Sequence, residues 1–317
     1  MLKRISSQAI QMSCAAYLSP LIAQLMAQQG MGKSSRGVIA VGRLSIDRDP
    51  TVGADPAPSA DGPALSAAAG AWLVGVDAAV CAVIGPDFPT RLILEFTRAG
   101  IDTSRIRPIG GGDGEPGTDL DPSPEQLGSL SPRWSVHLCG FSPGRQREIV
   151  RAVSQRVACT TLDLDLAGVN QPDASELLAL AAQCDVFLPG HREVAQLWPG
   201  ETPRAVLRLM ARAGVPAAVI KLDAGGSLGM RDGEVISMPA FPVAASGRIL
   251  GGDVYAGAFA AVYAAEKDLR RAMAWATAAA SVAVESSVLL GQISDFARNR
   301  VEARAQILDG AMKAHSD

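Results

Sequence analysis

The chain has 317 residues and a formal net charge of −3 at pH 7. Hydrophobic residues make up 48% of it and charged residues 19%, so the chain can bury a large core, and global disorder is excluded. A mildly acidic protein without a basic run gains nothing from attraction to a phosphate backbone, so we expect no nucleic-acid partner.

The cysteines give a first indication of the compartment. The sequence has five cysteines and three histidines, and no two cysteines form a CxxC pair, so we expect no zinc site. Most of the cysteines lie in or beside apolar, strand-like runs, where cysteine usually acts as a small core residue: Cys81, Cys139, Cys159 and Cys184. These features predict a reducing, cytoplasmic environment.

Residues 1–36 differ from the rest, because they contain basic residues and serines but no acidic residue. Such a segment fits a transit peptide, a surface helix, or an extension upstream of a domain that begins near Met31. Its apolar stretches are interrupted by Ser19 and Pro20, so we expect no membrane span. The sequence therefore predicts an N-terminal extension, 1–36, and one domain, 37–317.

From Gly37 onward, short apolar runs alternate with helical patterns. Strands are predicted at 38–42, 80–84, 136–139, 159–164, 185–188 and 217–222. Helices are predicted at 63–76, 88–99, 144–156, 173–183, 202–213, 253–265, 268–286 and 295–314. Residues 48–61 and 103–133 are rich in Gly and Pro and are predicted to be loops. Apolar strands that alternate with helices indicate an α/β fold with a parallel sheet covered on both faces.

The segment 250–259 is the sharpest local motif, because Gly251 and Gly252 lead directly into a helical run. Backbone N–H groups at a helix start, together with the helix dipole, favour a negatively charged ligand. Asp253 could there take a proton from an alcohol that attacks a phosphoryl group. An ordinary turn followed by a helix cap explains the same residues, and both interpretations stay open at this point.

The same segment resembles the C-terminal signature of the PfkB family, the ribokinase-like carbohydrate and nucleoside kinases. Asp253 falls on the catalytic base of that family, and Gly252 on the last glycine of its anion hole. Further resemblances follow in chain order. Gly42–Asp47 resembles the first strand and the substrate-binding aspartate of the family, and Asp61–Ala68 resembles its substrate loop. Asp163 resembles an aspartate that ends a central strand. Pro189–Glu193 resembles a motif linked to magnesium and phosphate, and Lys221–Leu228 resembles a motif on the nucleotide side. The similarity spans 37–290.

The resemblance implies a three-layer, ribokinase-like α/β fold with a central, mostly parallel sheet and a reduced or missing β lid. It implies transfer of the γ-phosphoryl group of ATP, with Mg²⁺, to a hydroxyl of a sugar or sugar-like molecule, a nucleoside being the next candidate. Asp253 would accept the hydroxyl proton, and the N–H groups of 250–253 would hold the developing charge. Arg248 would assist as a clamp; its other interpretation is a solvated loop charge.

The resemblance also assigns residues to each ligand. The substrate side is implied to contain Asp47, Gly62 and Ser66. The nucleotide side is implied to contain Lys221, Asp223, Gly226 and Thr277, and Glu193 would organise magnesium. A homodimer is also implied as an option, although the common dimer contact of the family uses the lid.

Several positions depart from the family pattern. Leu250 replaces the first glycine of the anion hole, and Asp223 places a carboxylate where a nucleotide brings negative charge. These departures leave a second hypothesis open, a non-catalytic binding or regulatory protein built on the same fold. A dinucleotide-binding enzyme is not expected, because no GxGxxG follows the first strand.

Overall fold

The computed structural model describes residues 36–47, 59–109, 120–166, 173–244, 251–285 and 293–314. Their strands are β1 (Gly37–Gly42), β2 (Ser45–Asp47), β3 (Ser59–Asp61), β4 (Asp77–Ile84), β5 (Ile101–Pro108), β6 (Trp134–Cys139), β7 (Thr160–Leu162), β8 (Val186–Phe187), β9 (Ala217–Lys221), β10 (Ser227–Arg231) and β11 (Glu234–Met238). Their α-helices are α2 (Pro63–Leu73), α3 (Thr90–Arg98), α4 (Pro124–Leu127), α5 (Pro143–Val153), α6 (Ala174–Ala181), α7 (His191–Leu197), α8 (Pro203–Arg212), α9 (Gly251–Glu266), α10 (Leu269–Ala283) and α11 (Asp295–Ala314).

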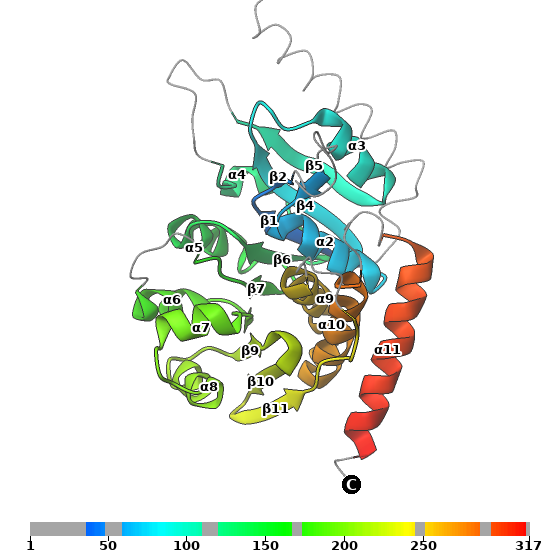
Figure 1. Ribbon diagram of the computed structural model, residues 1–317. Coiled ribbons are helices and arrows are strands. Elements are labelled where there is room, and N and C mark those ends of the chain that lie inside the picture. Colours follow the sequence, from blue (N-terminus) through cyan, green and yellow to red (C-terminus); the bar gives the residue numbers. More distant parts are fainter. Residues whose placement is uncertain are drawn as a thin grey trace, which may run out of the picture.

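Nine of these strands form one sheet in the order β11-β10-β9-β8-β7-β6-β1-β4-β5 (Figure 1). Neighbours pair in parallel from β5 to β9, whereas β10 and β11 continue the sheet as an antiparallel hairpin. The strand β1 is buried along its whole length, which explains why its sequence is a continuous apolar run without alternation. The predicted parallel sheet is confirmed.

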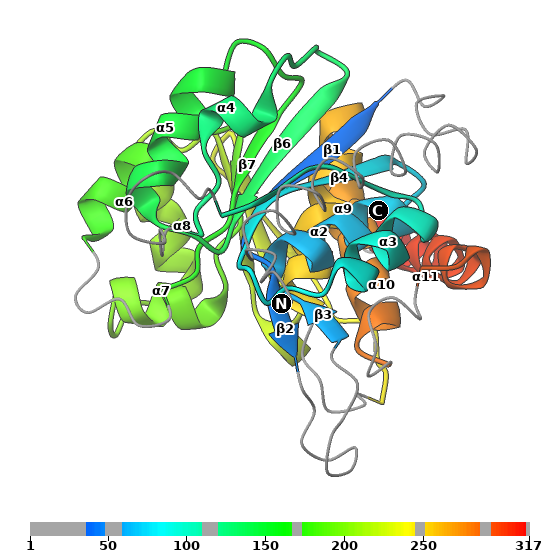
Figure 2. The same ribbon diagram turned by 90° about the horizontal axis from the view of Figure 1, so that it is seen from above.

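Helices cover both faces of the sheet, which makes the fold a three-layer α/β structure (Figure 2). One face packs against α2, α3, α9, α10 and α11, and the other against α4 to α8. Side chains of β1 alternate between the two cores, with Val38 and Ala40 in the first and Ile39 and Val41 in the second. All the helices predicted from the sequence are present, within a few residues of their predicted ends.

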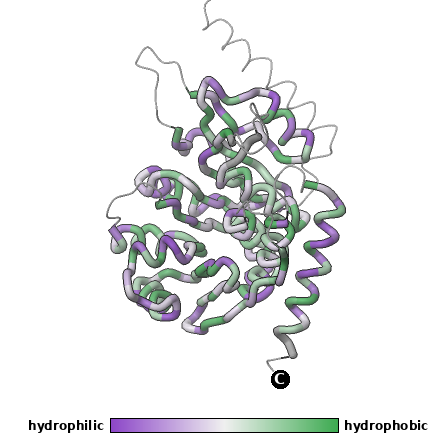
Figure 3. Tube along the Cα trace, viewed as in Figure 1, coloured by the Kyte–Doolittle hydropathy of each residue, from purple (hydrophilic) through white to green (hydrophobic). Residues whose placement is uncertain are grey.

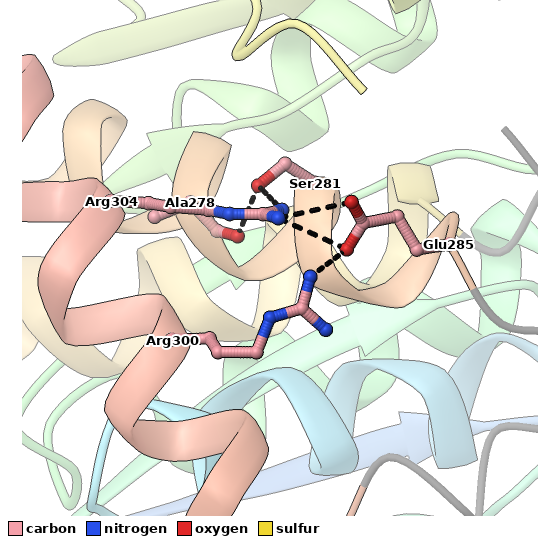
Figure 4. A network of polar contacts seen from close by, with 5 residues as sticks. All are labelled: Ala278, Ser281, Glu285, Arg300 and Arg304. Carbon is pink, nitrogen blue, oxygen red and sulfur yellow. Dashed lines mark hydrogen bonds and ion pairs between the residues drawn. The ribbon is translucent and has the colours of Figure 1, made fainter. Parts of the chain in front are cut away.

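The last helix, α11, is amphipathic and is held against its neighbours by aromatic and charged contacts. Hydrophilic and hydrophobic positions alternate along it in Figure 3, and Ala297, Val301, Ala305 and Leu308 are its buried positions. The guanidinium of Arg304 donates to both carboxylate oxygens of Glu285 at 3.0 Å and to Ser281 Oγ at 2.9 Å, and Arg300 pairs with the same carboxylate (Figure 4). This network fixes α11 to the end of α10.

Two predicted loops contain regular structure. Residues 103–108 belong to β5, and α4 lies within the rest of the 103–133 stretch. A register shift between Ala79 and Cys81 of the neighbouring strand interrupts the pairing of β5, and this irregularity conceals its period in the sequence. Of the other stretch, residues 59–61 form β3, whereas 48–58 lie outside the described residues.

Strands β2 and β3 form a separate two-stranded antiparallel sheet, in which Asp47 pairs with Ser59 and Ser45 with Asp61. This small sheet is the only lid-like element among the described residues, in agreement with a reduced lid.

The hairpin of β10 and β11 was not predicted from the sequence. Its turn uses Asp232 and Gly233, both at positive φ, as an Asp-Gly turn requires. In the part of the chain that is described, no helix is long and apolar enough to cross a membrane.

Candidate active site

The carboxyl ends of the parallel strands bring charged residues together at one edge of the sheet, the usual ligand edge of an α/β fold. Asp163 follows β7 directly, and Lys221 is the last residue of β9. Asp253 lies in the first turn of α9, close enough to both for its charge to shift their pKa values. The candidate base is therefore part of a charged cluster, not an isolated helix cap.

Lys221 and Asp163 form an ion pair, in which Lys221 Nζ contacts Asp163 Oδ2. Only 12% of the lysine side chain and 3% of the aspartate side chain are exposed. Asp163 Oδ1 accepts a hydrogen bond from the backbone N–H of Leu164 at 2.9 Å, so each carboxylate oxygen has a partner. A buried charge pair of this kind is tolerable because its hydrogen bonds are made.

The surroundings of this pair shift both pKa values upward. Burial raises the pKa of Asp163 to about 7; Lys221 opposes this rise, and the negative charges of Asp253 and Glu193 add to it. Burial alone would lower the pKa of Lys221, but the carboxylates of Asp163, Asp253 and Glu193 outweigh it and raise the pKa. The lysine therefore keeps its positive charge in the middle of the cluster.

Glu193 reaches this cluster from α7 because the residue at the start of that helix is a glycine. A Cβ placed on Gly190 would lie 2.4 Å from Glu193 Oε2, so the carboxylate occupies the space of the missing side chain. Gly190 also forms a bridge with Lys221, and the N–H of Lys221 donates to Pro189 O at 3.0 Å. The missing side chain of Gly190 thus leaves room for the Glu193 carboxylate, whose charge reaches Lys221.

The two glycines before Asp253 have different surroundings. Gly251 is buried, and a Cβ there would meet Val284 at 2.8 Å, whereas Gly252 is exposed and a Cβ there would meet nothing within 4 Å. The structure therefore leaves open space beside Gly252, where the sequence predicted an anion cradle. Arg248 and Leu250, the other predicted parts of that cradle, lie outside the described residues.

The predicted substrate residues lie at the start of α2 and in the two-stranded sheet. Gly62 is the residue before α2, at φ 121°, and a Cβ there would lie 2.7 Å from Arg43 O, so no other residue fits easily. Ser66 is fully buried, and its Oγ has no hydrogen-bond partner among the described residues. Asp47 ends β2; the placement of its side chain is outside what the structure describes.

Of the predicted nucleotide residues, Lys221, Asp223 and Gly226 lie at the turn between β9 and β10, and Thr277 lies on α10. Asp223 is exposed at φ 50°, and its carboxylate lies 3.4 Å from Nδ1 of His191 at the start of α7. The backbone requires glycine at position 226 whether or not a nucleotide binds, because φ is 84° and a Cβ there would lie 2.1 Å from Met238 O. Thr277 on α10 is 6% exposed, and its Oγ1 has no partner among the described residues.

Sequence analysis assigned Lys221 to the nucleotide and gave Asp163 no role. The structure places the ammonium of Lys221 against Asp163, within the cluster that contains Asp253, and its assignment to the nucleotide stays a prediction. A signal for this arrangement was present, because both residues stand at the carboxyl ends of predicted strands and such ends meet at one edge of a parallel sheet. The contact between His191 and Asp223 had no comparable signal.

The family model of pfkB family carbohydrate kinases matches residues 118–290, a range that contains Asp163, Glu193, Lys221 and Asp253. No sequence among the curated proteins matches the chain.

Solved structures of the same fold match over most of the chain. Aminoimidazole riboside kinase from Salmonella enterica, complexed with aminoimidazole riboside and an ATP analog, is 16% identical with a TM-score of 0.70, covering 85% of this chain and 100% of its own. Arabidopsis thaliana ribokinase, complexed with ribose and ATP, is 19% identical with a TM-score of 0.67, covering 86% and 99%. Fructokinase with bound ATP from Xylella fastidiosa is 16% identical with a TM-score of 0.70, covering 86% and 99%.

At these identities the solved structures establish the fold, and the family model establishes the relationship. The charged cluster at the carboxyl edge and the glycine-led helix that carries Asp253 lie within the matched range. The chain belongs to the pfkB family of carbohydrate kinases.

Proposed function

We propose that this chain transfers the γ-phosphoryl group of ATP to a hydroxyl group of a sugar or sugar-like molecule. The observation that carries the proposal is the position of Asp253, in the first turn of α9 and electrostatically coupled to Asp163 and Lys221 at the ligand edge of the sheet. A carboxylate there can accept the proton of an attacking hydroxyl, and the adjacent helix start can hold negative charge.

Two buried hydroxyl groups are candidates for ligand contacts. Ser66 Oγ, on the substrate side, and Thr277 Oγ1, on the nucleotide side, have no hydrogen-bond partner among the described residues. A buried hydroxyl without a partner destabilises a protein by about 1–3 kcal/mol, so each such group calls for an explanation, and a ligand or a bound water would supply one. We therefore assign Ser66 to the sugar, beside Asp47 and Gly62, and Thr277 to the nucleotide.

Glu193 fits a magnesium ion held mainly by water and phosphate oxygens. Among the described residues no group of three or more His, Cys, Asp or Glu side chains could hold a metal. Magnesium usually takes only one or two protein carboxylates and keeps several waters, so a single carboxylate such as that of Glu193 suffices for the proposal. With ATP, the ion would supply charge compensation for the phosphates, and Arg248 would assist with a further positive charge.

In the proposed reaction Asp253 binds and orients the substrate hydroxyl and removes its proton as the new oxygen–phosphorus bond forms. The bond between the γ-phosphorus and the bridging oxygen of ADP breaks, and ADP leaves with that electron pair. The backbone around Gly251 and Gly252 stabilises the charge on the transferred group, and the open space beside Gly252 accommodates it.

The test is a phosphorylation assay with ATP and Mg²⁺ on a panel of sugars, sugar alcohols and nucleosides. We expect one class to be phosphorylated, and Asp253→Asn to lower kcat by about 10²- to 10⁴-fold, the usual contribution of a general base. Turnover that survives this substitution would remove Asp253 from its role. Absence of ATP binding in calorimetry would favour the non-catalytic alternative.

A further inference from the structure

Arg304 of α11 joins two segments that are far apart in the sequence. Its guanidinium donates to Ser281 Oγ and to both carboxylate oxygens of Glu285, at the end of α10 (Figure 4). The same guanidinium lies over the ring of Phe241, in the segment that follows β11, with 4.7 Å between its Cζ and the ring centre. Only 13% of the Arg304 side chain is exposed, so these contacts are shielded from water, unlike those of a surface ion pair.

The end of α10 also packs against the start of α9. A Cβ on Gly251 would lie 2.8 Å from Cγ1 of Val284 and 3.9 Å from Cβ of Ala280. Thr277, which we assign to the nucleotide, precedes Ser281 by four residues and therefore lies on the same face of α10. The position of the last turns of α10 thus sets both the room beside Gly251 and the place of the Thr277 hydroxyl.

The segment after β11 packs against the turn between β9 and β10. A Cβ on Gly226 would lie 2.1 Å from Met238 O and 2.7 Å from the backbone N of Ala240. Phe241 follows Ala240 directly and packs, partly buried, against the same core as α10. A shift of Phe241 would therefore be passed to the turn at Gly226, which is also on the predicted nucleotide side.

We infer that Arg304 is a positioning residue for the nucleotide: its guanidinium holds the end of α10 to the segment after β11, so that Thr277 and Gly226 keep the places in which they meet ATP. The inference rests on the proposed function. Arg304 does not have to contact ATP itself, because its donors already serve Ser281 and Glu285. Changes in a packed network can alter the affinity for a ligand that the changed residue does not touch.

The test is ATP binding, measured by calorimetry, in Arg304→Met. Glu285 stays paired with Arg300 in this variant, so its buried charge keeps a partner and the chain should still fold. We expect the Kd for ATP to rise about 2- to 30-fold, and KM for the sugar to stay unchanged. Phe241→Leu, which removes the ring and keeps the ion pairs, should raise the Kd for ATP by a smaller factor.

Asp309→Asn is the matched control, because it weakens another ion pair between α11 and α10. Arg271 Nη1 lies 3.2 Å from Asp309 Oδ2, and Arg271 stands about 20 Å before Glu285 along α10. This control should keep the Kd for ATP of the wild type. An unchanged Kd in Arg304→Met would overturn the inference, and so would an equal rise in Asp309→Asn, since Arg304 would then only hold α11 in place.

A readout that needs no ligand separates this inference from the proposed function. If the wild-type chain binds no ATP, the proposed function fails, and hydrogen exchange of the amides can still be followed. The N–H of Val284, which donates to Ala280 O at 3.0 Å, is expected to exchange faster in Arg304→Met but not in Asp309→Asn. Unchanged exchange at the end of α10, or an equal increase throughout the sheet, would contradict the inference whether or not ATP binds.

Discussion

Gly257 of α9 lies directly against the backbone of Ala67 in α2: a Cβ at position 257 would come within 1.8 Å of Ala67 O. A second glycine makes the reciprocal contact, since a Cβ on Gly70 would lie 2.1 Å from Val254 O. The two helices therefore cross with their backbones in contact. Because Gly62 and Ser66 of the proposed substrate site lie at the start of α2 and α9 carries Asp253, this crossing sets the distance between the proposed substrate site and the proposed base.

Gly257→Ala is expected to destabilise the fold and to lower kcat. The added methyl group meets backbone, which cannot rotate away, and overpacking of this kind typically costs about 1–3 kcal/mol. The helices must separate, which displaces Asp253 from the substrate, and a displacement of about 1 Å can cost 10²-fold in rate. Chemical unfolding and steady-state kinetics measure the two effects.

Gly310→Ala is the matched control, because Gly310 is also in a helix and a Cβ there would meet nothing within 4 Å. It should stabilise the chain by about 0.5–1 kcal/mol through helix propensity and leave kcat unchanged. If Gly257→Ala behaved like Gly310→Ala, the close crossing would not control the site.

Asp223 is the departure from the family pattern with the most direct consequence for the nucleotide. Its carboxylate is exposed, lies 3.4 Å from Nδ1 of His191, and is held at a positive φ that favours glycine. Asp223→Gly removes the negative charge next to the proposed phosphate site. We expect KM for ATP to fall several-fold, with a smaller effect at high salt, because exposed charges are screened.

Asp232→Gly is the control for Asp223→Gly. Asp232 is likewise an exposed aspartate at positive φ, 53°, but it lies in the turn of the hairpin that joins β10 and β11. Both variants relieve the same backbone conformation, so their effects on stability should be similar, and only Asp223→Gly should alter KM for ATP. Equal KM values in the two variants would mean that the charge of Asp223 is not sensed by the nucleotide.

Much of the fold could be predicted from the sequence, because β1 and α9 carry strong local patterns. β1 is an apolar run closed by Gly42, and α9 begins with a pair of glycines. The strand β5 was missed because its pairing with β4 is irregular and a Gly/Pro-rich stretch follows it. The hairpin of β10 and β11 was also missed, although the Asp-Gly pair at its turn is a recognised hairpin signal.

The candidate site was only partly predictable. The order of the motifs along the chain identified Asp253 as a candidate base and Glu193 as a candidate magnesium ligand, since each residue stands in a short segment that resembles a family motif. The ion pair of Lys221 with Asp163 could not be inferred from motif order, because Asp163 follows another strand and the pair forms only when β7 and β9 lie in one sheet. The unpartnered hydroxyls of Ser66 and Thr277 depend likewise on tertiary packing.

Those two hydroxyls give a paired prediction. Ser66→Ala and Thr277→Val each remove a buried hydroxyl that has no partner among the described residues, so each should stabilise the ligand-free chain by about 1–3 kcal/mol. Ser66→Ala should raise KM for the sugar, and Thr277→Val should raise KM for ATP. Each variant is the control for the other, since a general structural effect would change both constants together. Loss of stability in either variant would indicate that its hydroxyl has a partner inside the protein.

His137 predicts how the protein responds to acid. Its ring is fully buried in β6, where Nδ1 lies 2.8 Å from Thr161 Oγ1 and Nε2 has no partner among the described residues. Burial, with a smaller contribution from the positive charge of Lys221, lowers the pKa of His137 to about 3 from the ordinary 6.5. Sequence analysis made no functional assignment of this histidine, and the structure places it in the core.

The direction in which pH changes the stability follows from proton uptake by His137 on unfolding. Between about pH 6.5 and pH 3 the unfolded chain protonates this histidine and the folded chain does not, so stability falls as the pH falls through that range. The slope contributed by one such group reaches about 1.4 kcal/mol per pH unit. Replacing the pair by His137→Leu with Thr161→Val should therefore shift the midpoint of acid unfolding, followed by circular dichroism, to lower pH.

His191→Gln serves as the control in that experiment, because His191 has an exposed side chain and lies at the surface beside Asp223. This variant removes an exposed histidine and keeps the buried His137, so its midpoint of acid unfolding should match that of the wild type. A double variant at His137 and Thr161 that unfolds at the wild-type pH would show that other groups determine acid stability. A shift toward higher pH would mean that the buried polar pair itself stabilises the sheet more than its acid sensitivity costs.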